Sequence, residues 1–262
     1  MMTKKHCRRR RSDIKPKFSE VSETYDSYGC AQRYCFELLE EALPEHAETV
    51  LDLGCGTGTN TYKLHHRLKS KKTVGVDQAL PMIEYAKSRN MDSTIEFIHA
   101  NIEDYHVKKQ VDLILSNASL QWVADGQHIQ RLCKEGMGEK THFVFSVFLP
   151  GTFRELSEAL NEVFEDTIEL PCHSFRDIDG YKDIVTPMFK VCNIQQKKIL
   201  IAFDSVKELL MSIRKTGVAD ASNPLFLTPK KLQRLNEKMM KKGCVLGSFD
   251  VGIFNCFNEN MR

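Results

Sequence analysis

A short glycine-rich stretch constrains the fold more than any other part of this sequence. Residues 50–58 read V-L-D-L-G-C-G-T-G, so a mostly apolar run containing one acidic residue leads into three glycines at alternate positions. The pattern is typical of a buried parallel strand that ends in a tight turn, with a helix opening at Thr57 or Gly58. Glycines let the backbone approach a ligand without an intervening Cβ atom, and the helix N-terminus directs its free N–H groups at an anion. The stretch therefore predicts an anion-binding turn.

A second acidic residue indicates which ligand this turn binds. The next apolar run, Thr73–Val76, ends in Asp77, 23 residues after Gly54. An acidic residue about 20 residues beyond such a turn is placed to hold ribose hydroxyls. Position 59 is threonine, which departs from the dinucleotide pattern G-x-G-x-x-G, and the turn lacks the G-K-[ST] of a P-loop. The pattern D-x-G-x-G-x-G resembles motif I of the class I S-adenosylmethionine (SAM) methyltransferases, in which the ligand anion is the methionine carboxylate.

Strand-like and helix-like segments alternate along the first 150 residues, which predicts a doubly wound α/β fold. We expect strands at 50–53, 73–76, 95–99, 111–116 and 142–148, and helices at 31–42, around Leu64 and Leu68, at 82–89 and at 127–133. The second half predicts helices at 153–164, 205–215 and 228–240 and strands at 197–203 and 245–257. The resemblance to class I SAM methyltransferases implies a Rossmann-like, mostly parallel sheet of seven strands, with a helical N-terminal lid.

Charge divides the chain into a basic tail and a mildly acidic body. Residues 1–17 hold eight Lys and Arg and one Asp, whereas residues 18–262 hold 29 basic and 34 acidic residues. The tail is open to interpretation as an RNA-binding arm or a localisation signal, but it has no aromatic residues for base stacking, which favours a solvated terminus. We therefore expect one methyltransferase domain at 18–262, with a lid or insertion near 152–191 and no nucleic-acid partner.

The cysteines and the hydropathy pattern indicate a cytoplasmic enzyme. The tail has no apolar segment of the kind found in signal peptides, and no run approaches 18 apolar residues. Nine cysteines without a C-x-x-C pair suggest reduced thiols. No Cys/His cluster has metal-ligand spacing, because His65 and His66 are adjacent and are not expected to share a helical face. We expect no metal, no membrane contact and a monomer.

Ligands of open α/β sheets bind at the carboxyl ends of the strands. The third expected strand is followed by Asn101 and Ile102, and many SAM enzymes have Asp at the position of Asn101, where it accepts from the adenine amino group. The fourth strand is followed by Asn117–Trp122, and Trp122 is equally compatible with an active-site wall and with the core. The expected cofactor-binding residues are Asp52, Gly54, Cys55, Gly56, Gly58, Asp77, Gln78, Met82, Asn101, Ile102, Ser116 and Gln121.

Several further segments resemble one family of SAM enzymes. They are Phe18 with Tyr25, Asp26 and Gln32; Asn117–Trp122; Pro150–Leu156; Phe203 with Ser205; and Leu209–Gly217, followed by Leu227 and Thr228. Together with the glycine motif they look like the malonyl-acyl carrier protein O-methyltransferases of biotin synthesis. The chain departs from that family at Asn101 and at Pro229, where a basic residue is usual.

The resemblance implies transfer of a methyl group from SAM to the free carboxylate of a malonyl thioester. This carboxylate is already ionised at pH 7, so no general base is needed and catalysis can rest on alignment and desolvation. A buried carboxylate does need a cationic or hydrogen-bonding partner. Arg214 is the first candidate and Arg154 the second, while Tyr25 is expected to close over SAM and Trp122 to wall the site.

The carrier of the malonyl group stays open between acyl carrier protein and coenzyme A. Carrier proteins are typically acidic, so a local basic patch is needed on this acidic body. Its candidate residues are Lys207, Arg214, Lys215, Lys230 and Lys231. The alternatives are methylation of another small carboxylic acid, such as aconitate or a fatty acid, methylation of RNA, and SAM binding without turnover.

Overall fold

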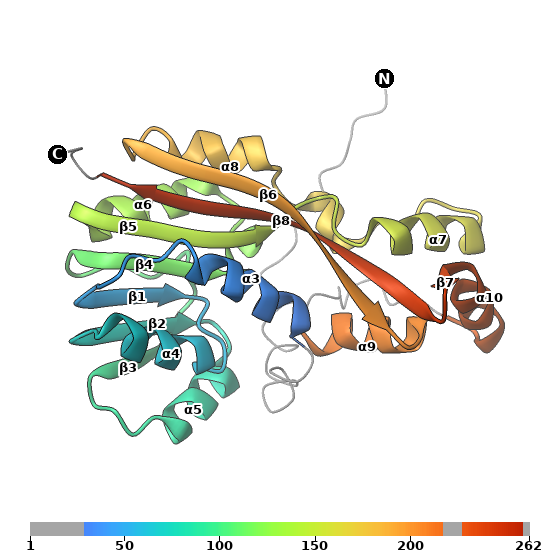
Figure 1. Cartoon of the computed structure of the whole chain (residues 1–262), viewed down its shortest axis with the longest axis horizontal. Coiled ribbons are helices and arrows are strands. Elements are labelled where there is room, and N and C mark those ends of the chain that lie inside the picture. Colours follow the sequence, from blue (N-terminus) through green and yellow to red (C-terminus); the bar gives the residue numbers. More distant parts are fainter. Residues whose placement is uncertain (1–28, 217–226, 259–262) are drawn as a thin grey trace.

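The computed structural model describes residues 29–216 and 227–258, which form one sheet flanked by helices (Figure 1). The strands follow the order β3-β2-β1-β4-β5-β8-β6, and a short β7 pairs with β8. Their bounds are β1 Thr49–Leu53, β2 Lys72–Asp77, β3 Ile95–His99, β4 Val111–Asn117, β5 Met137–Phe148, β6 Val191–Phe203, β7 Met240–Lys241 and β8 Cys244–Phe257. The first five strands pair in parallel, and β8 runs antiparallel to β5 and β6. The predicted doubly wound, mostly parallel sheet is confirmed, with the two-residue β7 added to the seven expected strands.

Alternation along the central strands divides the apolar side chains between two cores. In β1, Val50 joins the core on one face of the sheet, whereas Leu51 and Leu53 join the core on the other, as the two-residue repeat of a strand requires. Helices on both faces cover these cores. The helices are α3 Cys30–Glu40, α4 Thr59–Leu68, α5 Leu80–Arg89, α6 Gly126–Gly136, α7 Arg154–Phe164, α8 Ile178–Val185, α9 Val206–Lys215 and α10 Pro229–Met239, with 3₁₀ turns η2 Leu120–Trp122 and η3 Pro171–Ser174.

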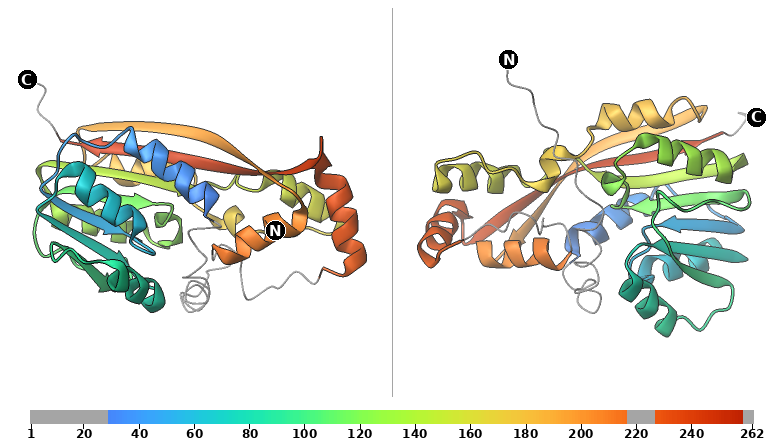
Figure 2. Two further views of the ribbon diagram at one scale, coloured as in Figure 1. Left: turned by 60° about the horizontal axis from the view of Figure 1, so that its bottom comes forward. Right: turned by 180° about the vertical axis from the view of Figure 1, so that it is seen from behind.

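Strands β6 and β8 extend past the rest of the sheet and carry a second group of helices. Residues 251–257 of β8 pair with both β5 and β6, whereas residues 245–250 pair with β6 but not with β5, and Val245 also pairs with Met240 of β7. Helices α7, α9 and α10 gather around this extension, on the side where the parallel strands end (Figures 1 and 2). Their buried faces join the same core as α3 and α4, so the two parts of the molecule share one hydrophobic core.

Segment 152–191, expected as a lid or insertion, holds two helices that pack in different places. Helix α7 contacts α10, whereas α8 contacts α6 beside the sheet. Tyr181, Ile184 and Val185 are the buried face of α8, at helical spacing that is too short to stand out in the sequence. The expected N-terminal lid falls on residues 18–28, outside the described residues, so both lid assignments stay predictions. No helix within the described ranges is long and apolar enough to cross a membrane.

Candidate SAM site

The carboxyl ends of β1, β2, β3 and β4 are tied together by backbone and side-chain hydrogen bonds. The N–H of Gly54 donates to the carbonyl of Val76 at 2.7 Å, and the N–H of Ala100 donates to the carbonyl of Asp77 at 3.0 Å. The hydroxyl of Ser116 donates to the carbonyl of Leu53 at 2.8 Å. The four strand ends therefore form one continuous edge, which is where a doubly wound sheet binds its ligand.

The glycine turn after β1 takes a backbone shape that other residues adopt at a cost. Gly54, Gly56 and Gly58 have φ values of +77°, +54° and +75°. A Cβ atom on Gly54 would overlap the side chain of Ser119, and one on Gly58 would lie 2.6 Å from Phe97 Cζ. At Gly56, by contrast, no described atom lies within 4 Å of the Cβ position. Gly54 and Gly58 are thus needed for packing, whereas Gly56 faces open space of the kind a ligand occupies.

Asp77 holds this turn from the end of β2. Its carboxylate accepts from the N–H of Gly56 at 2.9 Å through Oδ2 and from the N–H of Ala79 at 2.8 Å through Oδ1. Burial raises the pKa of Asp77, while these two hydrogen bonds oppose the rise. The carboxylate therefore stands where the glycine turn and the loop after β2 meet, the place expected for a group that binds ribose hydroxyls.

Asp52 is the second buried carboxyl group of the edge. The hydroxyl of Thr61, on the first turn of α4, donates to Asp52 Oδ2 at 2.6 Å. The pKa of Asp52 is raised to about 7, chiefly by burial, with the Thr61 hydrogen bond lowering it and the charge of Asp77 adding to the rise. Thr61 was not identified from the sequence, although it shares the inward stripe of α4 with Leu64 and Leu68.

Asn101 and Gln121 complete the cofactor side of the edge. The side-chain oxygen of Asn101 accepts from the N–H of Glu103 at 3.0 Å and so shapes the loop after β3. Gln121 is buried, and its Nε2 donates to the carbonyl of Ala118 at 2.7 Å. Its Oε1 is also buried and has no hydrogen-bond partner among the described residues. A buried unpaired acceptor costs about 1–3 kcal/mol, which a ligand donor such as an ammonium group would offset.

The remaining expected cofactor residues lie along the same edge. Cys55 and Met82 are buried, and burial raises the pKa of the Cys55 thiol, which favours a packing role over a reactive one. Gln78 directly follows β2, Ile102 lies three residues after the end of β3, and both are partly exposed. The groups at this edge fit SAM. Open space at Gly56, the carboxylates of Asp52 and Asp77 and the unpaired amide oxygen of Gln121 all lie at the carboxyl ends of the strands. Their contacts with SAM stay predictions.

Trp122 lies three residues beyond Ser119, whose side chain is hydrogen-bonded to the glycine turn, and this places Trp122 beside the expected acceptor side of the site. Ser119 Oγ donates to the carbonyl of Gly54 at 3.3 Å, and the N–H of Trp122 donates to the carbonyl of Ser119 at 3.1 Å. The Trp122 ring is partly buried and meets Phe175 edge to face, with centroids 5.1 Å apart. Trp122 is thus packed in the core and also lies close to the glycine turn. Its role as a wall of the active site stays a prediction.

The candidate substrate cations differ in their surroundings. Arg154 is exposed on α7 and pairs with Glu158 at 2.9 Å. Arg214 is exposed in the last turn of α9 and makes no ion pair with a described residue. Helix α9 runs from the end of β6 back towards the sheet (Figure 1), so its last turn lies at the end nearer the strand edge. Tyr25 lies outside the described residues.

The five residues expected to form a basic patch lie on two helices in contact. Lys207, Arg214 and Lys215 belong to α9, and Lys230 and Lys231 belong to α10. Lys231 turns inward, with its Nζ 3.7 Å from the centre of the Phe164 ring. Lys207, Arg214 and Lys230 are exposed and Lys215 is partly exposed, so Lys231 is the member of the five that is held against a ring.

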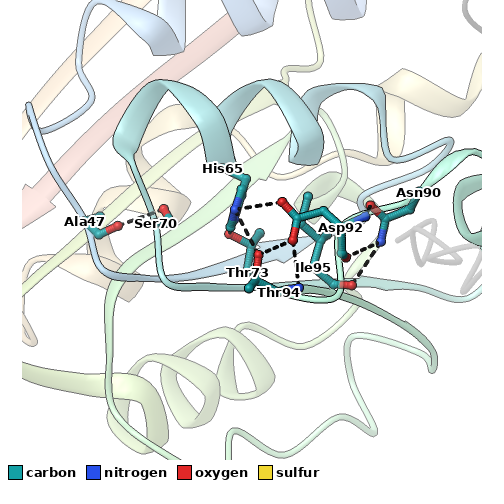
Figure 3. Close-up of polar contacts among 8 residues, drawn as sticks. All are labelled: Ala47, His65, Ser70, Thr73, Asn90, Asp92, Thr94 and Ile95. Carbon is teal, nitrogen blue, oxygen red and sulfur yellow. Dashed lines mark hydrogen bonds and ion pairs between the residues drawn. The ribbon is translucent and has the colours of Figure 1, made fainter.

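A separate polar cluster joins the end of α4 to β2 and the loop before β3 (Figure 3). His65 Nδ1 lies 2.9 Å from Thr73 Oγ1, and Nε2 lies 3.1 Å from Thr94 Oγ1 and 3.4 Å from Asp92 Oδ2. The ligand atoms of His65, His66 and Asp92 converge within 4.8 Å, contrary to the expectation that adjacent histidines cannot meet. Since both His65 nitrogens already have hydroxyl partners and burial lowers its pKa, the network is complete as a structural link.

Comparisons with known proteins agree with this geometry. A family profile described as a methyltransferase domain matches residues 50–136. The malonyl-[acyl-carrier protein] O-methyltransferase 2 of Ilyobacter polytropus is 28% identical over 242 residues, which cover 89% of this chain and 91% of that protein. The trans-aconitate 2-methyltransferase of Escherichia fergusonii is 42% identical over 93 residues, but these cover only 36% of each chain.

Solved structures share the fold. The YcgJ protein of Bacillus subtilis superposes with a TM-score of 0.56 at 14% identity, covering 87% of this chain and all of that one. A SAM-dependent methyltransferase of Mesorhizobium loti gives a TM-score of 0.50 at 16% identity and covers 86% of this chain and 99% of that one. At these identities the likeness establishes the architecture.

Proposed function

Because the chain belongs to the class I SAM-dependent methyltransferases, we propose that it methylates the free carboxylate of a malonyl group carried as a thioester, giving the methyl ester that primes biotin synthesis. The observation that carries this proposal is the extent of the similarity. Likeness to malonyl-[acyl-carrier protein] O-methyltransferases spans 89% of the chain. It therefore includes the helices around the extended β6–β8 pair as well as the SAM-binding half. A match confined to the glycine motif would support only SAM binding.

The residues of the edge have separate tasks in this reaction. Asp77 and the glycine turn would hold the cofactor, with Asp52 and Gln121 facing its charged groups. SAM, when bound, supplies a methyl group activated by a positively charged sulfur. The acceptor carboxylate is ionised at neutral pH and needs no general base, so the chain has to align and desolvate it. Arg214 is the proposed carboxylate partner, because Arg154 already pairs with Glu158.

Methylation of a free tricarboxylic acid such as trans-aconitate is the second candidate. The 42% identity over 93 residues favours it locally. Both acceptors are carboxylates, so the same cofactor edge serves either reaction. The two candidate reactions would use the second group of helices, α7, α9 and α10, differently. A carrier-bound substrate would contact these helices, and a small free acid would not. For the carrier we favour acyl carrier protein over coenzyme A, and we propose a cytoplasmic monomer.

Mass spectrometry of the products tests the proposal. The protein is incubated with isotopically labelled SAM and, separately, malonyl-acyl carrier protein, malonyl-coenzyme A, trans-aconitate and total RNA. We expect labelled methyl ester on the malonyl thioesters, and none with succinyl-coenzyme A as the control acid. Label on aconitate alone would replace the proposal with the second candidate. SAM binding without S-adenosylhomocysteine formation on any acceptor would indicate a binding protein.

A further inference from the structure

Helix α10, strand β7 and the turn after β7 concentrate positive charge. Residues 228–243 hold six basic residues and one acidic residue, Glu237, whereas the rest of 18–262 holds 23 basic and 33 acidic residues. Glu237 accepts a hydrogen bond from Gln233 at 2.9 Å. The buried face of α10 is apolar, formed by Leu235 and Met239, and its charged side chains other than Lys231 are exposed. The segment is a local exception on an acidic body.

Four of the six cations are available to a partner. Lys231 is occupied by the Phe164 ring, and Lys238 pairs with Glu162. The other four are exposed, and none of them makes an ion pair with a described residue. They are Lys230, Arg234, Lys241 and Lys242, called the α10 cations below. On the helix, Lys230 and Arg234 are four residues apart and therefore share one face.

The position of α10 suits a partner that stays outside the site. It packs against α7 and α9 at the end of the molecule away from the parallel strands (Figures 1 and 2). Helix α9 lies between α10 and the sheet and ends on the sheet side. A protein bound at α10 would therefore leave the strand edge open, and a flexible arm on that protein would follow α9 towards the edge.

We propose that the α10 cations are the docking surface for the malonyl-loaded acyl carrier protein. This inference rests on the proposed function, since the carrier is the source of the substrate. Carrier proteins are acidic, and charge complementarity steers encounter and fixes orientation at protein surfaces. The remainder of this body is acidic overall and would repel such a partner. A second basic stretch, residues 63–72, leads into the amino end of β2, away from the site, and there Lys71 and Lys72 pair with Glu48 and Glu96. Malonyl-coenzyme A presents the malonyl group on the same kind of flexible arm but without a protein. Its methylation should therefore not depend on the α10 cations.

Charge reversal with two substrates tests the surface. The variant carries Lys230→Glu, Arg234→Glu, Lys241→Glu and Lys242→Glu. The matched control reverses four exposed lysines around the amino ends of β4 and β5, Lys108→Glu, Lys109→Glu, Lys134→Glu and Lys140→Glu. The melting temperature and SAM affinity of each variant are measured first. We expect kcat/KM for malonyl-acyl carrier protein to fall at least about tenfold in the α10 variant at low salt. kcat/KM for malonyl-coenzyme A should stay unchanged, and the control should lose neither activity.

The outcomes separate this surface from the proposed function. An unchanged kcat/KM with the carrier, or an equal fall with both thioesters in a folded variant, would overturn the docking surface while leaving methyl transfer intact. If the wild-type protein methylates neither thioester, the proposed function fails and the carrier surface fails with it. Loss of binding to a fluorescent single-stranded RNA, with normal carrier kinetics, would assign the α10 cations to nucleic acid instead.

Discussion

Asp77 Oδ2 accepts a hydrogen bond from the backbone N–H of Gly56 at 2.9 Å, which joins the end of β2 to the turn after β1. The same carboxylate is the expected partner of the SAM ribose, so it acts on the turn and on the ligand at once. In the Asp77→Ala variant we expect SAM affinity to fall by about 1–3 kcal/mol, the usual loss for a charged hydrogen-bond partner. Calorimetry on the folded variant measures this, with exposed Asp183→Ala on α8 as the control. Unchanged affinity would contradict the ribose assignment.

Two glycines of the turn should respond differently to the same substitution. Gly54→Ala introduces a Cβ that overlaps Ser119 at a positive φ, so we expect a fall in melting temperature along with lost SAM binding. Gly56→Ala meets no described atom within 4 Å, and the left-handed backbone alone costs about 1–2 kcal/mol. This variant should fold and bind SAM weakly, because its methyl group enters the proposed ligand space. Normal SAM affinity in Gly56→Ala would place the ligand elsewhere.

The raised pKa of Asp52 predicts a pH dependence for both stability and binding. Burial raises this pKa from 3.8 to about 7, so between these values the folded protein holds a proton that the unfolded chain has released. The contribution of Asp52 to the free energy of unfolding is therefore full below pH 3.8 and is lost as pH rises through about 7. The cationic groups of SAM favour the ionised carboxylate, so we expect SAM affinity to rise from pH 6 to pH 8.

Calorimetry at both pH values, in two buffers of different ionisation enthalpy, detects the accompanying proton release. In Asp52→Asn the carboxyl group is absent, so the release should disappear and the stability profile should flatten. A wild-type affinity that does not change with pH would contradict a contact between Asp52 and the cationic part of SAM.

The sequence predicted the central strands and the helices α7, α9 and α10 closely, but it missed α8 and placed the start of β6 at Lys197, for physical reasons. Val50–Leu53 in β1 and Phe143–Phe148 in β5 are buried in the middle of the sheet, so their apolar pattern is strong and the structure places strands there. Strand β6 begins at Val191 rather than Lys197, because it is an edge strand whose exposed polar residues hide the period. The pairing of Asp52 with Thr61 depends on how α4 crosses the sheet, which local sequence does not encode.

The basic tail should be dispensable for the proposed reaction. Residues 1–17 carry eight basic residues and one acidic residue, and they lie outside the residues that the structure describes. We expect a protein that lacks them to keep its kcat/KM for malonyl thioesters within about twofold, since rim charges chiefly affect encounter rates. Steady-state kinetics at low and high salt measure this. A loss that tracks RNA binding and salt concentration would favour the RNA alternative.

Arg214 gives the sharpest prediction about the acceptor. It is exposed in the last turn of α9 without an ion-pair partner among the described residues, and its guanidinium can hold a carboxylate through two hydrogen bonds. Arg214→Ala should lower kcat/KM for malonyl thioesters about tenfold to a hundredfold while SAM affinity stays unchanged. The kcat/KM of Arg214→Lys should lie between those of the wild type and Arg214→Ala, because lysine keeps the charge but cannot make two parallel hydrogen bonds. Arg154→Ala is the matched comparison, since Arg154 already pairs with Glu158.

If Arg154→Ala is the variant that loses turnover while Arg214→Ala is normal, the two assignments are reversed. If both are normal, the carboxylate is held by neutral donors, with Gln121 the first to substitute.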